Sequence, residues 1–252
     1  MKIIGEDHQG IRLLTLDDGR MNALNRQSCD RLVKAIEDAG RQAQALVLTG
    51  NGTAFCAGGD LELLERWSDW EPPRRTEEVA EGPQRVSHAL LAAPVPTVAA
   101  IDGWAVGAGL DLSLVCDLRL ASTSARFREG YVHVGVLAGD GAGWLLPRHV
   151  GMGAALDLLL TGRTVDAEEA RSLGLVGRVV EPAILQTEAL EVARQLAAHP
   201  RQGYLAIRRS VYESAVESFG AHLRTAALQM GSLGGTEEHR QAVAGLRDRR
   251  PS

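Results

Sequence analysis

The stretch TVAAIDGWAVGAGLDLSLVCDLRLAS, from Thr97 to Ser122, decides the fold. The run TVAAI predicts a buried strand, GAGLDLSLVCD predicts a helix that opens on glycines, and LRLAS predicts a second strand. The same kinds of element occur upstream, where a predicted helix over residues 26–43 precedes the apolar strand ALVLTG at 45–50. Strands that alternate with helices are typical of crossover units, so we predict an α/β fold.

The flanking segments predict smaller elements. Residues 2–18 predict two short strands around a polar turn at 6–10, which together form a hairpin. Residues 70–84, WEPPRRTEEVAEGPQ, combine prolines, charges and a glycine without apolar periodicity, and predict a mobile loop that serves as a lid or pocket wall and leads into the next helix. Asp166, with Glu169 three residues on, is expected to cap a short helix that ends near Gly174 before a strand.

The pattern changes beyond about Pro182, where four segments have helical periodicity and no strand lies between them. These segments are 183–199, 202–215, 221–233 and 237–249. We therefore predict two parts, a core over residues 1–190 and a helical subdomain over 191–252. An all-helical end of this kind is a natural place for subunit packing.

Composition limits the class of function. The chain has 252 residues, 45% of them hydrophobic, and a formal net charge of -5, which argues against nucleic acid or an anionic membrane as partner. No apolar stretch approaches the roughly 20 residues of a membrane span, and MKIIGEDHQG lacks the apolar region of a secretion signal. Three widely spaced cysteines fit reduced thiols, and the histidines lack metal-ligand spacing. We expect a cytoplasmic protein without a metal site.

Three glycine-rich stretches are candidates for holding an anion: residues 49–61, 103–112 and 135–144. None has the GK[ST] ending of a phosphate-binding loop or a GxGxxG motif placed for a dinucleotide, so nucleotide binding is the weaker hypothesis. For any one stretch, tight turns alone would explain the glycines. In combination, the amides near Gly59 and Ala108 can converge from two loops on one oxygen, as in an oxyanion hole.

Five motifs together resemble the crotonase, or enoyl-CoA hydratase/isomerase, superfamily. They are NALN at 22–25, AFCAGGDL at 54–61, GWAVGAGLDL at 103–112 with CDLRLAS at 116–122, and GLVGRVV at 174–180. The similarity runs from about residue 10 to the C-terminus, where EEHRQAVAGLRDRR is similar to the family's last helix. The resemblance implies a spiral of ββα units with a C-terminal helical trimerisation region, in trimers or hexamers, and an acyl-CoA substrate with no permanently bound cofactor.

The resemblance also implies binding residues. The amides of Gly59 and Ala108 would form the oxyanion hole, and the backbone of Ala23 and Ala57 would contact the CoA adenine. The family usually has a basic residue before its NAL stretch, and Arg20 is the nearest candidate, one place closer to the asparagine than in the hydratases. The C-terminal Arg249 or Arg250 would reach a CoA phosphate.

Three residues are the candidate catalytic groups. Asp111 stands where hydratases of the family carry their first catalytic glutamate, and burial among leucines would raise its pKa toward the useful range. The second glutamate is replaced by Tyr131, which is a poor base near neutral pH because its ordinary pKa is about 10. Asp140 is the proposed replacement. The structural alternatives are a solvated or ion-paired Asp111, an Asp140 that caps the next helix, and a Tyr131 that only packs.

Other side chains near these residues leave several functions open. His133 would share a face with Tyr131 only on a strand, Glu129 fits poorly by spacing, and Trp67, Trp70 and Trp144 either line the acyl pocket or pack in the core. The main hypothesis is an enoyl-CoA hydratase or isomerase that stabilises a thioester enolate. The alternatives are a hydrolase or C–C cleaving enzyme on a β-dicarbonyl, in which Asp140 with Tyr131 or His133 activates water, and a non-catalytic CoA-binding or assembly subunit.

Overall fold

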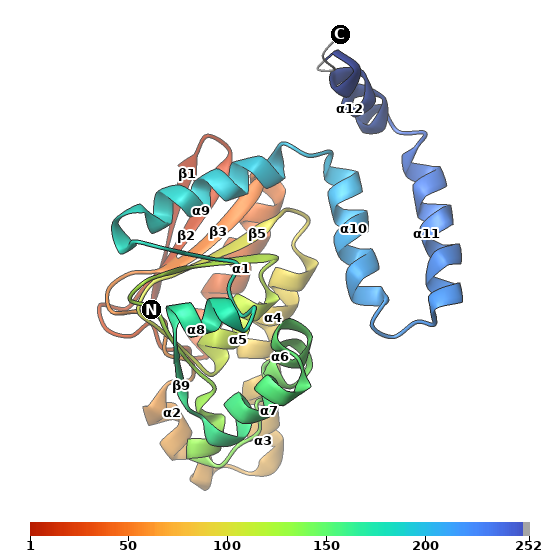
Figure 1. Ribbon diagram of the computed structural model, residues 1–252. Coiled ribbons are helices and arrows are strands. Elements are labelled where there is room, and N and C mark those ends of the chain that lie inside the picture. The colour runs from red at the N-terminus through yellow and green to blue at the C-terminus, as the bar shows by residue number, and fades with distance from the viewer. Residues whose placement is uncertain (249–252) are drawn as a thin grey trace. The chain divides into compact units, whose positions relative to one another are not determined.

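The computed structural model describes residues 1–248 and falls into two compact units, Met1–Arg194 and a second unit from Gln195 onward. The sequence places the division between residues 190 and 191, and the contacts within the chain place it after Arg194. The predicted α/β fold is confirmed in the first unit (Figure 1).

The larger sheet of the described residues has six strands in the order β1-β2-β3-β5-β7-β10. β1 and β2 form the predicted antiparallel hairpin, and every further neighbour pairs in parallel. The side chains of β3 and β5 are almost all buried, as in a strand covered on both faces. The strands are β1 (Lys2–His8), β2 (Ile11–Asp17), β3 (Ala45–Gly50), β5 (Thr97–Ile101), β7 (Leu118–Ser122) and β10 (Arg178–Val180).

A smaller sheet of four short strands has the order β4-β6-β8-β9. These strands are β4 (Ala54–Cys56), β6 (Trp104–Val106), β8 (Arg126–Arg128) and β9 (Thr164–Asp166). The chain passes from β3 to β4, from β5 to β6 and from β7 to β8, so each turn adds one parallel strand to each sheet before the next helices begin. This repeating path is the ββα spiral that the resemblance implies.

Helices separate successive turns of the spiral. α1 packs against α4, and α4 packs against α5. The predicted cap of α8 is present, because the Asp166 carboxylate accepts the Glu169 amide at 2.9 Å, and Gly174 follows the helix with φ +81°. These helices are α1 (Arg26–Gln42), α2 (Leu61–Glu65), η1 (Arg66–Asp69), α3 (Pro72–Ala80), α4 (Pro83–Ala92), α5 (Ala108–Val115), η2 (Gly130–Val134), α6 (Ala142–Val150), α7 (Met152–Thr161) and α8 (Ala167–Ser172).

The expectation of a loop within residues 70–84 is wrong, because Pro72–Ala80 form α3, whereas the expected start of the next helix is confirmed by α4, which begins at Pro83. Pro72 and Pro73 occupy the first two positions of α3, where the missing N–H has no intrahelical acceptor to lose. Arg75 and Val79, one turn apart, are half-buried on one face of the helix. The prolines therefore mark a helix start and not a break.

The C-terminal part is helical throughout its described residues, as predicted. α9 (Pro182–Ala197) leads out of the first unit, and α10 (Arg201–Glu213), α11 (Phe219–Leu233) and α12 (Glu237–Asp248) form the second. Within the second unit α10 contacts both other helices, with the Gln202 amide 3.0 Å from the Glu238 carboxylate. Neither α10 nor α11 has a buried residue in this single chain.

The three cysteines are free and buried. Among residues 1–248, no helix has both the length and the apolar character that a membrane crossing requires.

Candidate active site

One cavity, here called the main cavity, gathers the glycine-rich segments that the sequence singles out. Its volume is about 470 Å³, within the usual range of small-molecule sites. Its lining includes the turn after β4, the beginning of α5, the start of η2 and the loop before α6, in the form of residues 57–60, 106–108, 130–131 and 139–140. Segments that are far apart in the sequence thus meet at one site.

Two glycines allow this close approach. A Cβ at Gly58, whose φ is +82°, would lie 2.5 Å from the Val106 carbonyl oxygen and 3.3 Å from the Ala108 nitrogen. A Cβ at Gly109 would lie 2.1 Å from the Cys56 carbonyl oxygen. The contacts of a Cβ with the Val106 and Cys56 carbonyl oxygens are too short for any larger residue. Glycine is therefore needed to bring the turn after β4 against the beginning of α5.

Gly59 and Ala108 line the main cavity from these two segments. Ala108 is the first residue of α5, so its N–H has no intrahelical acceptor. The Gly59 N–H has no acceptor among the described residues, since the neighbouring backbone bonds join Leu24 to Gly58 and Asp60. Two unpaired donors beside one cavity are the arrangement that an oxyanion hole requires.

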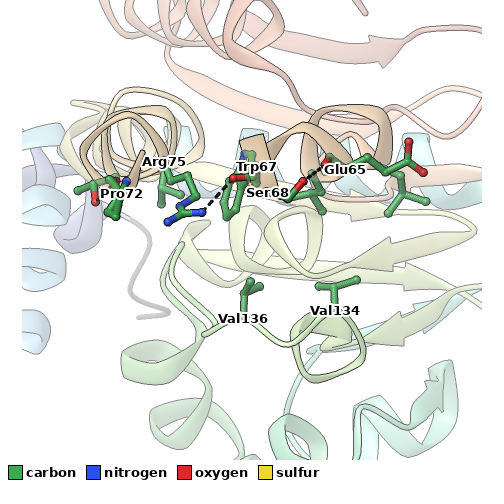
Figure 2. Close-up of a pocket in the computed structure, with 11 residues that line it drawn as sticks. Glu65, Trp67, Ser68, Pro72, Arg75, Val134 and Val136 are labelled. Atoms are coloured by element: carbon green, nitrogen blue, oxygen red, sulfur yellow. Dashed lines mark hydrogen bonds between the residues drawn. The ribbon is translucent and has the colours of Figure 1, made fainter. Parts of the chain in front are cut away.

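A second cavity of about 830 Å³, here called the side cavity, shares part of this lining. Figure 2 shows Trp67 and Arg75 on one side of it and Val134 and Val136 on the other. The Arg75 guanidinium donates to the Trp67 carbonyl oxygen at 3.0 Å, which ties α3 to η1. The segment 70–84 therefore forms a pocket wall, as predicted, but as a helix. The lining residues common to both cavities are Leu61, Leu64, Trp67, Thr76, Val79, Val134 and Val136.

Of the three candidate tryptophans, Trp67 lines both cavities and the other two line neither. The Arg74 guanidinium stacks on Trp70 at 3.9 Å from the ring centroid, and Arg148 stacks on Trp144 at 3.8 Å. Trp144 is also 41% exposed, so it is not a core residue.

Asp111 lies in the first turn of α5 and has no exposed surface, which contradicts the alternative of a solvated side chain. Burial, followed by repulsion from Asp140, raises its pKa from the ordinary 3.8 to about 7, against hydrogen bonding from Tyr131 and Ala142. It is not among the residues that line the main cavity, whereas Tyr131 and Asp140 are. A molecule in the cavity therefore meets Tyr131 and Asp140 first.

The Tyr131 hydroxyl connects the two aspartates. Its oxygen lies 2.9 Å from Oδ2 of Asp111 and 2.9 Å from Oδ2 of Asp140. The ring rests against Gly107, where a Cβ would be 3.6 Å away. Burial and three neighbouring carboxyl groups raise the pKa of the phenol well above its ordinary value, so the hydroxyl can pass a proton but not act as an anionic base. Tyr131 therefore does more than pack.

Asp140 is held in place from α4. The Ser87 hydroxyl donates to the Asp140 carbonyl oxygen at 3.0 Å, and the Gln84 amide donates to the Gly139 carbonyl oxygen at 2.8 Å. The Asp140 carboxylate makes no cap for α6, whose N-cap residue is Gly141 without a side-chain cap bond. Burial raises its pKa, and the Tyr131 hydroxyl opposes the rise. The capping alternative is therefore wrong.

Glu129 is a residue of this site that spacing did not identify. It is 1% exposed, and burial and the Asp111 charge raise its pKa well above the ordinary value. The backbone turns at Glu129, with φ -86° and ψ 84°, between β8 and η2, which brings residues 129 and 131 to the same cluster. The signal available in the sequence was an acidic residue two places before Tyr131.

His133 lies outside the cluster, because residues 130–134 form a 3-10 helix and not a strand. Its side chain is directed to the end of α7, where Nε2 lies 3.0 Å from the Gly162 carbonyl oxygen. His133 does not line the main cavity.

The candidate CoA-binding residues lie on adjoining turns. The Asp18 carboxylate accepts the amides of Arg20 and Ala23, at 2.7 and 3.1 Å, and the Ala57 amide donates to the Met21 carbonyl oxygen at 2.9 Å. With both amides so used, Ala23 and Ala57 have only their carbonyl groups left for a ligand. The Arg20 side chain is exposed. Arg249 and Arg250 lie outside the described residues.

The part of the chain that the structure describes holds no cluster of three or more metal-ligating side chains suited to a metal ion.

Comparison with known proteins gives one consistent family. A family model described as "Enoyl-CoA hydratase/isomerase" matches residues 6–250. A probable enoyl-CoA hydratase of Rhodobacter capsulatus is 32% identical over 98% of this chain and 95% of its own length. The trans-2-decenoyl-[acyl-carrier-protein] isomerase of Streptococcus mutans is 30% identical over 96% of this chain and 93% of its own. The crystal structure of an enoyl-CoA hydratase from Polaromonas sp. JS666 aligns with a TM-score of 0.93, at 26% identity, over 98% of this chain and 97% of that chain.

Proposed function

The chain belongs to the enoyl-CoA hydratase/isomerase family, and we propose that it moves a proton along the acyl part of an acyl-CoA thioester. In this proposal the Gly59 and Ala108 amides hold the thioester oxygen as it becomes an enolate oxygen. The observation that carries the proposal is the bonded series Asp140, Tyr131 and Asp111, which begins at the cavity where these two amides are unpaired.

Asp140 is the group that would exchange the proton with the substrate. It lines the main cavity, and its Oδ1 is buried without a hydrogen-bond partner among the described residues, so this oxygen lacks a donor. Asp60 and Glu78 also line the cavity, but neither is bonded to Tyr131, and Asp60 caps α2. Tyr131 would pass the proton between Asp140 and Asp111, whose raised pKa suits it to accept and return a proton near neutral pH.

This arrangement favours isomerisation of the double bond over hydration. Isomerisation needs one group that takes a proton from one carbon and returns it to another. Hydration needs a second group to hold and activate water, and the position of the second family glutamate is occupied by Tyr131, whose pKa is raised further. Both activities occur in the names of relatives, a probable enoyl-CoA hydratase and a trans-2-decenoyl-[acyl-carrier-protein] isomerase, so the choice rests on the site.

The test is a comparison of substrates with purified protein. We expect turnover of a 3-enoyl-CoA to the 2-enoyl-CoA, slower hydration of crotonyl-CoA, and no cleavage of a β-diketone. Asp140→Asn, which keeps the shape of the side chain, should lower kcat by about 10²- to 10⁴-fold and leave CoA binding by calorimetry unchanged. Cleavage of the diketone instead would favour the hydrolase, and full activity of Asp140→Asn would remove Asp140 from the reaction.

The same proposal includes the CoA contacts, in which Ala23 and Ala57 bind the adenine through their carbonyl groups and Arg20 and Arg249 approach the phosphates. Single Arg→Ala substitutions should raise KM for the CoA thioester without changing kcat, because uniform binding is lost.

We also propose assembly into a homotrimer, or a dimer of trimers, through the second unit. Its helices expose large apolar side chains that a single chain leaves in water, such as Ile207 at 69%, Phe219 at 78% and Leu228 at 75%. Exposed apolar surface of this extent marks an interface. Light scattering after gel filtration measures the mass, and a monomer at micromolar concentration would contradict the proposal.

The three free buried cysteines fit the reducing cytoplasm, which cell fractionation tests.

A further inference from the structure

Glu129 is a buried carboxyl group for which the proposed reaction has no use. It is 1% exposed, and neither of its oxygens has a hydrogen-bond partner among the described residues. No ion pair involves it in the part of the chain that the structure describes. Arg128, its neighbour on β8, directs its Nε to the Gly162 carbonyl oxygen at 2.9 Å instead. An ionised carboxylate in such surroundings would be strongly unfavourable.

Asp111 also has a carboxyl oxygen without a hydrogen-bond partner. Its Oδ2 is 2.9 Å from the Tyr131 hydroxyl, but its Oδ1 is buried without a hydrogen-bond partner. The carboxyl groups of Asp111 and Glu129 act directly on each other, since their interaction lowers the pKa of the first and raises that of the second. A proton on Glu129 would supply a further donor to the Asp111 carboxylate.

The hydrogen bonds of Tyr131 require another proton in the cluster. The phenol oxygen is 2.9 Å from an oxygen of Asp111 and 2.9 Å from an oxygen of Asp140, yet its single hydrogen can serve only one of them. The other contact is a hydrogen bond only if that aspartate carries a proton. The titratable groups that interact with Glu129 are Asp111, Asp140 and Tyr131, all of them acids, and like charges so close together cannot all ionise.

We propose that Glu129 is a positioning residue that stays protonated and donates a hydrogen bond to Asp111, so that Asp111 is the member of the pair that ionises. The role of Asp111 in catalysis rests on the proposed function, but the protonation of Glu129 does not. Glu129 acts through Asp111 and touches no substrate, in agreement with its position away from the main cavity.

The first test is the pH profile of kcat/KM for wild type, Glu129→Gln and Glu129→Met. Glutamine keeps a neutral donor, so the acid-side midpoint should stay at the wild-type pH. Methionine removes the donor from ionised Asp111, so the midpoint should move upward by about one to two pH units. If Glu129 were ionised, both variants would remove a repelling charge and move the midpoint downward. A downward shift, or no shift with methionine, overturns the proposal.

The second test needs no turnover. The infrared difference spectrum of wild type minus Glu129→Gln at neutral pH should contain the C=O stretch of a protonated carboxylic acid. The carboxylate stretches in its place would overturn the proposal. If the protein converts no acyl thioester, the proposed function fails while this spectrum still decides the state of Glu129, so the two failures are distinguishable. The spectrum also decides the matter if Glu129→Met does not fold.

Discussion

The substitution Asp111→Asn should make the protein more stable relative to the wild type as the pH rises from 5 to 8. A buried acid whose pKa is raised in the folded state makes folding less favourable as the pH rises, because the unfolded chain ionises first. Below the ordinary pKa of 3.8 both states are protonated and the effect is absent, and it is complete above the folded pKa of about 7. Asparagine has the same shape and never ionises, so the variant does not lose this stability.

The magnitude follows from the difference between the two pKa values. From 3.8 to about 7 is roughly three units, which corresponds to about 4 kcal/mol. At pH 5 the unfolded carboxyl is already mostly ionised, so about 3 kcal/mol of the loss develops between pH 5 and pH 8. The variant also removes the Asp111 charge that raises the pKa of Glu129, and this acts in the same direction. A constant cost of the amide cancels in the comparison of the two pH values.

The assay is denaturant unfolding of wild type and variant at pH 5, 6, 7 and 8, at one protein concentration because assembly contributes to stability. The free-energy difference between variant and wild type should move by about 3 kcal/mol in favour of the variant from the lowest to the highest pH. Asp69→Asn, at an exposed aspartate in η1, controls for the loss of one charge. A difference that stays constant, or that moves against the variant as pH rises, would refute the reasoning.

Three further predictions concern the hydroxyl, the glycine contact and the pocket wall. Tyr131→Phe keeps the ring against its neighbours and should lower kcat by about 10²-fold with CoA binding retained in calorimetry. Gly109→Ala should destabilise the fold by about 3 kcal/mol in denaturant titration, because its Cβ would lie 2.1 Å from the Cys56 carbonyl oxygen; Gly153→Ala, with open space at its Cβ in α7, is the control and should be stabilising by about 0.5 kcal/mol. Val136→Phe should lower kcat/KM for a decenoyl thioester about tenfold more than for crotonyl-CoA in parallel assays.

The fold was predictable wherever local pattern and tertiary burial agree. Residues 97–122 are apolar almost throughout, so the strand, helix and strand were found by glycine placement and by apolar run length. The prediction of a loop in residues 70–84 failed because a proline pair is equally consistent with a break and with the first turn of a helix. Only the packing of Arg75 and Val79 on one face distinguishes the two, and the sequence does not state what that face packs against.

The candidate site was predictable in part for a similar reason. Asp111, Tyr131 and Asp140 were placed by the resemblance, and the structure brings their side chains together through one hydroxyl. Glu129 could not be placed, because its inclusion depends on the backbone turn between β8 and η2. Whether Asp111 meets the cavity directly or through Tyr131 also depends on side-chain burial, which spacing along a helix does not determine.

The helix α5 carries both the oxyanion donor and the buried acid of the proposed chemistry. Its first residue, Ala108, offers the amide for the thioester oxygen, and Asp111 follows three residues later, with every residue of the helix buried. Neither group can shift without moving the whole helix, so the distance between oxyanion donor and proton acceptor is fixed by the core. One wall of the side cavity is built separately, by α2, η1 and α3, whereas the opposite wall includes Val134 of η2, the helix that carries Tyr131. The choice of acyl group can therefore change through residues such as Trp67 and Val79 while the proton-transfer groups stay in place.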